Sequence, residues 1–445
     1  MSERNSIERV SSWSRDSVGL KIVVIGVIVL VLLIPSFMIR SLIGERQARR
    51  DSATEEVGAQ WASLQKVAGP ILTIPFLVPF TDSSGHTTTT MRYARFLPDE
   101  LVIGSDITSE TRYRGMFDVL VYTTRLSFAG SFAAPSFAEW SLPADQILWN
   151  DATVSFLITD LRGLREYPTL TWNQAKLTTR PSTGPGGGVL TGIHAPVDIT
   201  PGAGGEGPIA FTATIDLRGS RGLYFEPLGK ETRATVAANW NSPSFQGAFL
   251  PDERTITADG FSAGWKVLDL NRSYPQAWRG DLDRVRDSGF GVDLIFPVDE
   301  YRQSERTAKY AGLFLVLTFV TVFLVEVVSR RRVHPFQYLL IGCALVIFFV
   351  LLLSLSEHLP FELAYLIAGG VITLLIAGYA RAVLGCLRRA AAVGGIVAVL
   401  YGILFVVLQL EDFALLIGSL ALVAAIATAM YVTRNIDWYD VRAGG

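Results

Sequence analysis

Two long apolar runs near the C-terminal end of the chain, joined by a short polar turn, constrain its fold more than any other feature. The first run covers residues 335–356 and the second covers residues 361–380, so the turn extends only from Glu357 to Pro360. A helix needs about 20 apolar residues to cross the core of a bilayer. Two runs joined by so short a turn must form an antiparallel pair of membrane-spanning helices.

Four further runs have spanning length and cover residues 20–39, 310–329, 390–410 and 413–432. The loops between the last five runs alternate in charge: they carry first Arg330, Arg331 and Arg332, then Glu357, then Arg388 and Arg389, then Glu411 and Asp412. Lys and Arg favour the cytoplasmic side of short loops. The pattern therefore predicts six membrane-spanning helices, with the tails 1–19 and 433–445 inside. No small-x-small cleavage site follows the first run, which we interpret as an uncleaved anchor.

The region between the first and second spans, residues 40–309, is expected to lie outside and to be rich in strands. Residues 40–66 read as a helical stalk. The segments after it are rich in Val, Ile, Phe, Tyr and Thr and are interrupted by Gly, Pro and Asn. The predicted strands cover residues 69–80, 112–132, 152–161, 207–217, 234–240 and 290–298, and one more near 189–199. The fold class is thus a bundle of six transmembrane α-helices with a large β-rich domain inserted between helices 1 and 2.

An internal echo lies in this region, because Asp-Leu-Arg-Gly occurs at residues 160–163 and again at 216–219. A duplicated β unit and the chance recurrence of a turn that ends a strand both account for it, since Asp and Gly are common turn residues. The region has no cysteine: the two cysteines of the chain, Cys343 and Cys386, lie in the apolar C-terminal part. We therefore expect no disulfide in the β-rich domain.

No motif indicates a catalytic, cofactor or metal site, and we expect no enzyme and no cofactor. The four histidines, His86, His194, His334 and His358, do not form a zinc motif with each other or with the cysteines. The chain has no G-x-S-x-G nucleophile elbow. Ser354, Ser356 and His358 lie close in sequence, but catalytic pairs are recognised by geometry and not by adjacency. A net charge of −2 gives no bulk attraction to nucleic acid.

A cluster of ionisable residues is predicted where the outer turn meets the membrane. Its acidic side consists of Glu357 and Glu362, with His358 beside them. Residues 298–310 reach the membrane on the same side and carry three cations, Arg302, Arg306 and Lys309. We hypothesise that these opposite charges contact each other and fix the orientation of the β-rich domain. The alternative is a polar interfacial turn, in which Pro360 starts a helix and Glu362 complements its N-terminal dipole.

Two smaller polar features remain open. Glu326 lies inside the second span, four residues before Arg330, which favours a pair within one helix over a role as a proton relay. Asn271, Arg272 and Tyr274 form a compact polar segment in the β-rich domain. This segment is either a turn with a buried Arg–Tyr contact or part of a periplasmic binding surface.

The chain resembles the CreD family of bacterial inner-membrane proteins. The matching stretches are GPILTIPF (69–76), DLRGL (160–164), GIHAP (192–196), DLRGS (216–220), PSFQGAFLP (243–251), NRSYPQ (271–276), FGVDLIFPVDEYRQSERTAKY (290–310) and HPFQYLLIGCALVIFFVLLLSLSEHLPFELAYLIA (334–368). The resemblance implies an inner-membrane protein of Gram-negative bacteria that supports envelope integrity. It also implies a link to a two-component system and to the response to envelope stress and β-lactams, with no catalytic residues to transfer.

Two hypotheses about function follow. In the first, the chain is a non-enzymatic envelope protein whose periplasmic β domain, residues 40–309, binds or senses an envelope protein, peptidoglycan or a lipid. In the second, it is a transporter or lipid-handling protein with a path through the C-terminal bundle, where the pairs Gly369-Gly370 and Gly394-Gly395 permit close helix packing. A polar cavity through the bundle distinguishes the second from the first. The lipid bilayer is the expected partner in both, and the sequence leaves the oligomeric state undetermined.

Overall fold

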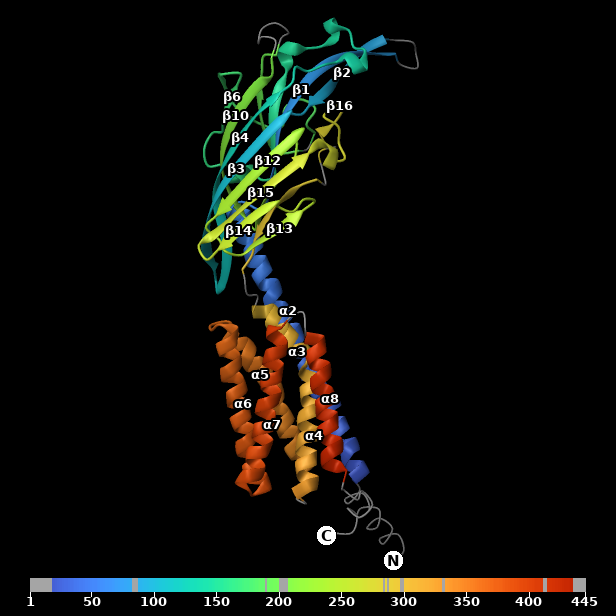
Figure 1. Cartoon of the computed structure of the whole chain (residues 1–445), viewed down its shortest axis with the longest axis vertical. Helices are drawn as coiled ribbons and strands as arrows, with labels where there is room; N and C mark the ends of the chain where they lie inside the picture. The colour runs from blue at the N-terminus through green and yellow to red at the C-terminus, as the bar shows by residue number, and fades with distance from the viewer. Residues whose placement is uncertain are drawn as a thin grey trace, which may run out of the picture. The chain divides into compact units, whose positions relative to one another are not determined.

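The computed structural model describes residues 18–81, 87–188, 190–199, 207–282, 285, 288–296, 300–329, 333–410 and 414–434 (Figure 1). The chain divides into two compact units. The helical unit comprises Met1–Arg49 and Val298–Gly445, and the β unit comprises Arg50–Pro297. A large β-rich region is thus combined with apolar helices in one chain.

The described part of the helical unit contains six helices that are long and apolar enough to cross a membrane. A short polar helix, α3 (Glu300–Lys309), precedes the second of them. The six long helices are α2 (Val18–Trp61), α4 (Ala311–Ser329), α5 (Pro335–Ser356), α6 (Phe361–Leu384), α7 (Leu387–Gln409) and α8 (Ala414–Thr433). Each of these helices covers all or most of one of the six apolar runs of the sequence. That each of them crosses a bilayer stays a prediction.

Helix α2 differs from the other five because it continues far beyond its apolar part. It has 44 residues, about 66 Å at 1.5 Å per residue, roughly twice the thickness of a bilayer core. The boundary between the two units falls within it, after Arg49. The helix ends at Trp61 and strand β1 begins at Gln65, so the expected helical stalk is a few residues shorter than residues 40–66.

Close contacts join α2, α4 and α5 inside the helical unit. Gly342 of α5 has no room for a side chain, because an added Cβ would collide with Leu32 of α2 and Phe319 of α4. Small residues allow such close approach between membrane helices, which associate by packing more than by the hydrophobic effect. The ring of Phe319 also meets that of Tyr338 edge to face, with the ring centres 5.7 Å apart.

The β unit consists of two mainly antiparallel sheets. In the first, the strand order is β13 (Pro243–Gly247), β17 (Phe290–Leu294), β11 (Gly222–Phe225), β1 (Gln65–Thr81), β5 (Thr153–Ile158), β9 (Gly192–Pro196) and β8 (Arg180–Pro181), with β2 (Thr87–Phe96) paired to β1 and β16 (Ala277–Arg279) paired to β2. In the second, the order is β14 (Glu253–Thr257), β15 (Gly260–Leu268), β12 (Glu231–Ala238), β3 (Glu100–Arg114), β4 (Phe117–Phe132), β10 (Ile209–Ser220), β6 (Thr169–Trp172) and β7 (Ala175–Leu177).

The two sheets share one apolar core. Exposed and buried residues alternate along β3, so that Leu101, Ile103 and Ile107 face inward. Across the core, Phe128 of β4 meets Phe156 of β5 edge to face at 5.2 Å between ring centres. Aromatic pairs in this arrangement stabilise a core beyond their buried area. The described residues of the unit therefore rely on packing and strand pairing, and both described cysteines of the chain are free and lie in the helical unit.

The structure corrects one predicted strand and clarifies the internal echo. The predicted strand 112–132 is the β3–β4 hairpin, which turns at Gly115 with a φ of +62°. Most of β3 escaped prediction because its exposed face carries polar residues such as Asp106. The first Asp-Leu-Arg-Gly copy forms a short 3-10 helix, η4 (Leu161–Gly163), whereas the second lies inside β10. The second copy is therefore not a turn.

Candidate functional site

A buried carboxylate joins three helices of the helical unit. Glu326, near the end of α4, is only 7% exposed. Its carboxylate accepts hydrogen bonds from the Tyr338 hydroxyl (2.7 Å) and from the backbone N–H of Val333 (2.9 Å). It also forms an ion pair with the ammonium of Lys21, in the first turns of α2, which donates to the carbonyl of Val333 (2.8 Å) as well. These four residues are called the Lys21–Glu326 cluster below.

Local sequence signals position the members of this cluster. Helix α5 starts with a capping box, in which His334 accepts from the N–H of Phe336 (3.2 Å) and Gln337 accepts from the N–H of His334 (3.0 Å). Pro335 suits this position because the backbone N–H groups of the first helical turn have no acceptor within the helix, so that the N–H that proline lacks is not missed. The cap fixes the start of α5 and places Tyr338 one turn inside the helix, within reach of α4.

The structure gives Glu326 a partner, Lys21, that the sequence analysis did not consider. The expected pair with Arg330 lies outside the described residues. Lys21 is 305 residues away in sequence from Glu326, and no local pattern links the two. A buried carboxylate that keeps its charge in a membrane needs such a counter-charge. The sequence offered one signal for this pair: Lys21 and Glu326 are both charged residues near the ends of apolar runs.

Helix α2 makes a second set of polar contacts at the other end of its apolar part. The guanidinium of Arg40 donates to the carbonyls of Ala308 (3.2 and 3.0 Å) and Lys309 (3.0 Å), the last two residues of α3. The final carbonyls of a helix lack partners within it, and a cation there also complements the helix dipole. Arg40 thereby ties α2 to the end of α3.

One member of the predicted ionisable cluster at the outer turn contacts helix α2. Glu357 forms an ion pair with Arg46 of α2 (3.6 Å), a cation that sequence reasoning did not select. Lys309 pairs with Glu305 within α3 (3.1 Å). Glu362 lies in the first turn of α6, as the alternative interpretation expects. The contact of Glu357 or Glu362 with the cations Arg302, Arg306 and Lys309, with His358 beside them, stays a prediction.

In the β unit, two residues of the predicted polar segment are buried, whereas Asn271 is exposed. Arg272 and Tyr274 are 9% and 5% exposed, and the guanidinium lies over the tyrosine ring at 4.4 Å from its centre. The Tyr274 hydroxyl donates to the carbonyl of Pro227 (3.2 Å), and Asn271 accepts from the N–H of Leu268 (3.2 Å). Burial raises the pKa of the Tyr274 hydroxyl above its usual range. The contact between Arg272 and Tyr274 is the buried Arg–Tyr contact that one of the two interpretations expected.

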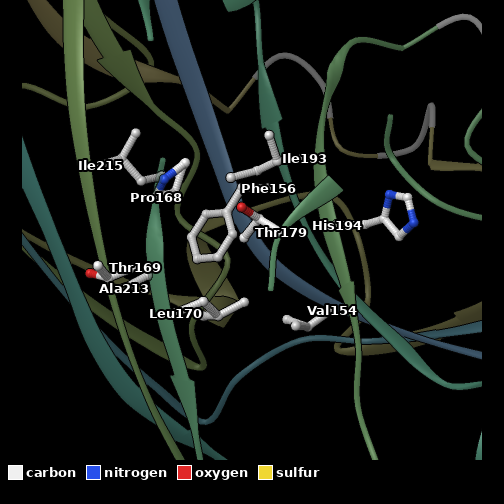
Figure 2. Close-up of a pocket in the computed structure, with 10 residues that line it drawn as sticks. All are labelled: Val154, Phe156, Pro168, Thr169, Leu170, Thr179, Ile193, His194, Ala213 and Ile215. Carbon is white, nitrogen blue, oxygen red and sulfur yellow. The ribbon is translucent and has the colours of Figure 1, made fainter. Parts of the chain in front are cut away.

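The described residues offer little that resembles a catalytic or metal site. Within the described ranges, no three His, Cys, Asp or Glu side chains gather as they would around a metal ion. The hydroxyl of Ser356 donates to the carbonyl of Leu353 in its own helix (3.0 Å). The seam between the two sheets of the β unit is lined by Val154, Phe156, Leu170, Ile193, His194 and their neighbours, and it leaves no room for a water molecule (Figure 2). This seam is part of the packed core.

Comparison with known proteins identifies relatives of the whole chain. A family model described as "Inner membrane protein CreD" matches residues 17–439. The chain is also similar to the "Inner membrane protein CreD" of Escherichia coli (strain K12), with 31% identity over 418 residues, which is 92% of this chain and 91% of the relative. The family match covers all the helices and strands that the structure describes.

Proposed function

Because the chain belongs to the CreD family of inner membrane proteins, we propose that it is a non-enzymatic protein that supports the integrity of the cell envelope. In this proposal the chain acts in the response to envelope stress and β-lactams and is controlled by a two-component system. The β unit binds or senses an envelope component: a protein, peptidoglycan or a lipid. The family resemblance of the long stretches at residues 290–310 and 334–368 supports this role.

The proposed topology has six spans, with both termini in the cytoplasm and residues 40–309 in the periplasm. It is supported by the alternation of arginine loops with acidic loops and by the six long apolar helices. Alkaline phosphatase, which is active only in the periplasm, tests it. We expect active fusions after Gly260 and inactive fusions after Arg332 or Arg389. An active fusion at Arg389 would contradict the topology.

One observation carries the idea that the β unit communicates with the bundle: α2 is a single helix that runs from the helical unit into the β unit. In the helical unit it is bonded at Lys21, Arg40 and Arg46. A continuous helix transmits shifts and rotations along its axis better than a loop, because its backbone hydrogen bonds resist bending. We propose that binding to the β unit acts on the bundle through α2.

A transporter or lipid-handling protein is the second candidate, and Glu326 favours it. Ionisable residues inside membrane helices often mark proton or ion pathways. In this chain the carboxylate is paired with Lys21 and bonded to Tyr338 and Val333. A pathway would require Glu326 to lose or exchange these partners during the transport cycle.

In-cell photo-crosslinking tests the binding role. A photoreactive residue is placed at Tyr167 or Leu270 of the β unit, which are 92% and 88% exposed, and at Leu374 of α6, which is 74% exposed. We expect the β-unit sites to capture an envelope component, and the α6 control to capture lipid. In parallel, a strain without the chain is compared with the complemented strain for β-lactam tolerance and an envelope-stress reporter. Equal behaviour of the two strains would contradict the proposed function.

A further inference from the structure

The end of helix α2 in the β unit is held by side chains from several strands and turns. The last carbonyls of a helix have no partner within it. Here the guanidinium of Arg162 donates to the carbonyl of Ala59 (2.6 Å), and the hydroxyl of Ser220 donates to the carbonyl of Ala62 (2.9 Å). The β unit therefore supplies hydrogen bonds to two carbonyls at the end of α2.

Arg162 is itself held by a buried carboxylate. Asp160 accepts from Arg162 Nε (2.9 Å) and Nη2 (2.7 Å), a two-pronged arrangement that fixes the plane of the guanidinium. The same carboxylate accepts from the N–H of Ser63 (3.1 Å), just after the helix end. Its hydrogen bonds to Arg162 hold the pKa of Asp160 well below its usual range. The carboxylate therefore stays ionised at neutral pH.

Trp61, the last residue of α2, contacts two guanidinium groups. Those of Arg112 and Arg218 lie over its ring at 4.4 and 4.5 Å from the ring centre. Cation–π contacts of this kind are strongest with tryptophan. The indole N–H donates to the carbonyl of Tyr122 (3.3 Å). The side chain is thus held by two cation–π contacts and one hydrogen bond.

Both copies of the Asp-Leu-Arg-Gly sequence take part in these contacts. Gln65 bridges them, because its amide donates to the carbonyl of Asp160 in the first copy (3.0 Å) and to that of Arg218 in the second (2.9 Å). Gly163 of the first copy leaves no room for a side chain, since an added Cβ would lie 2.5 Å from both the Gln65 amide and the Arg218 carbonyl. The two copies therefore lie against each other at the end of α2.

We infer that the two Asp-Leu-Arg-Gly segments form a clamp, the α2 clamp, through which the β unit controls helix α2. The clamp consists of Asp160, Arg162 and Arg218 together with Arg112 and Gln65, and it holds Ala59 and Trp61. Its role as a joint rests on the proposed function, in which a signal passes from the β unit to the bundle. The residues of the clamp are positioning residues, because they act by holding α2 in place.

Hydrogen–deuterium exchange of the full-length protein in detergent micelles tests the clamp. In Arg162→Ala the Ala59 carbonyl and Asp160 lose a charged partner, and we expect amides of residues 56–63 to exchange about 10- to 100-fold faster. Arg125→Ala is the matched control, because Arg125 is 69% exposed and pairs with Asp216 of the second copy (2.9 Å). Exchange in the control and in α5 should be unchanged.

Arg162→Lys is a second, milder variant for use if Arg162→Ala does not fold. It keeps the positive charge but loses the two-pronged contact with Asp160. We expect it to raise exchange of residues 56–63 less than Arg162→Ala does. Unchanged exchange in these variants, or an equal rise over all strands, would overturn the clamp.

The cellular arm separates the clamp from the proposed function. Arg162→Ala, present in the membrane at the wild-type level, should lose complementation of the envelope-stress phenotype, while Arg125→Ala should keep it. Faster exchange with full complementation would overturn the control of α2 by the clamp and leave the proposed function intact. A wild-type chain that complements nothing would refute the proposed function, while the exchange data would still decide whether the clamp holds α2.

Discussion

The Lys21–Glu326 cluster allows a quantitative prediction because its two charged side chains are buried to different extents. Lys21 is 22% exposed at its side chain and Glu326 is 8% exposed. We consider three variants: Lys21→Met, Glu326→Gln and the double variant. Methionine and glutamine are close in size to the residues they replace, so that the charges change while the packing is largely retained.

The cost of each single substitution depends on the charge that it leaves behind. Breaking a buried pair by removing one partner costs about 3–5 kcal/mol. Lys21→Met leaves a short, buried carboxylate that keeps Tyr338 and Val333, and we expect a loss of about 3 kcal/mol. Glu326→Gln leaves an ammonium on a long side chain that can extend toward water, so we expect about 2 kcal/mol.

The double variant should be more stable than Lys21→Met alone. It contains no unpaired charge and retains an amide that can bond Tyr338 or Val333. Polar contacts between membrane helices contribute about 0.6–2 kcal/mol, so we expect a total loss of about 1 kcal/mol, well below the sum of the single variants. This non-additivity is the signature of a charge pair.

Unfolding in mixed micelles with increasing SDS provides the free energies. Cys343 of α5 is a free thiol that lies five residues after Tyr338, and its rate of modification in a Cys386→Ser background reports the opening of this helix. Losses of the single variants that add up in the double variant would refute the paired arrangement. A Glu326→Gln variant with wild-type stability and no activity in cells would instead favour a proton-carrying role for Glu326.

Three further predictions follow from the two units. Asp160→Asn should lower the free energy of unfolding, measured by urea titration, by about 1–3 kcal/mol at pH 7. The native pKa of Asp160 is depressed. The difference in stability from wild type should therefore persist at pH 5 and shrink only below the ordinary carboxyl pKa of about 3.9. Glu357→Gln should lower the free energy of unfolding by at most about 1 kcal/mol, since its partner Arg46 is 34% exposed at the side chain. The double variant Glu357→Gln/Glu362→Gln should keep the wild-type folded yield in size-exclusion chromatography. A clear loss of folded protein would support the docking hypothesis. A fragment of residues 50–297 should fold with a strand-dominated circular dichroism spectrum that is insensitive to reductant, whereas a fragment that starts at Gly69 should not fold, because it lacks Trp61 and the start of β1.

Several features of the chain could be read from local sequence because local physics decides them. An apolar run such as residues 335–356 must form a helix in lipid, since every backbone polar group has to be satisfied within it. The start of α5 follows from His334, Pro335 and Gln337, which are neighbours in sequence. The composition of residues 69–298, rich in Val, Ile, Phe, Tyr and Thr, predicted strands. The long stretches that resemble the CreD family indicated the family.

The tertiary structure decided which distant residues meet. Lys21 and Glu326 are 305 residues apart, and no periodicity connects them. The strands β1 and β11 pair in parallel although they are far apart in sequence, so their adjacency depends on the order of the whole sheet. The burial of Arg272 and Tyr274 likewise depends on neighbours such as Pro227 and Leu228, which belong to another segment.

The repeated Asp-Leu-Arg-Gly sequence shows where the two kinds of information separate. The sequence by itself determined that the motif occurs twice, and that Asp and Gly suit a turn. Only the tertiary structure decided that one copy forms a 3-10 turn, that the other lies within β10, and that both meet at the end of α2. The physical reason is that backbone conformation at such a short motif is decided by strand pairing and burial, which depend on residues distant in the chain.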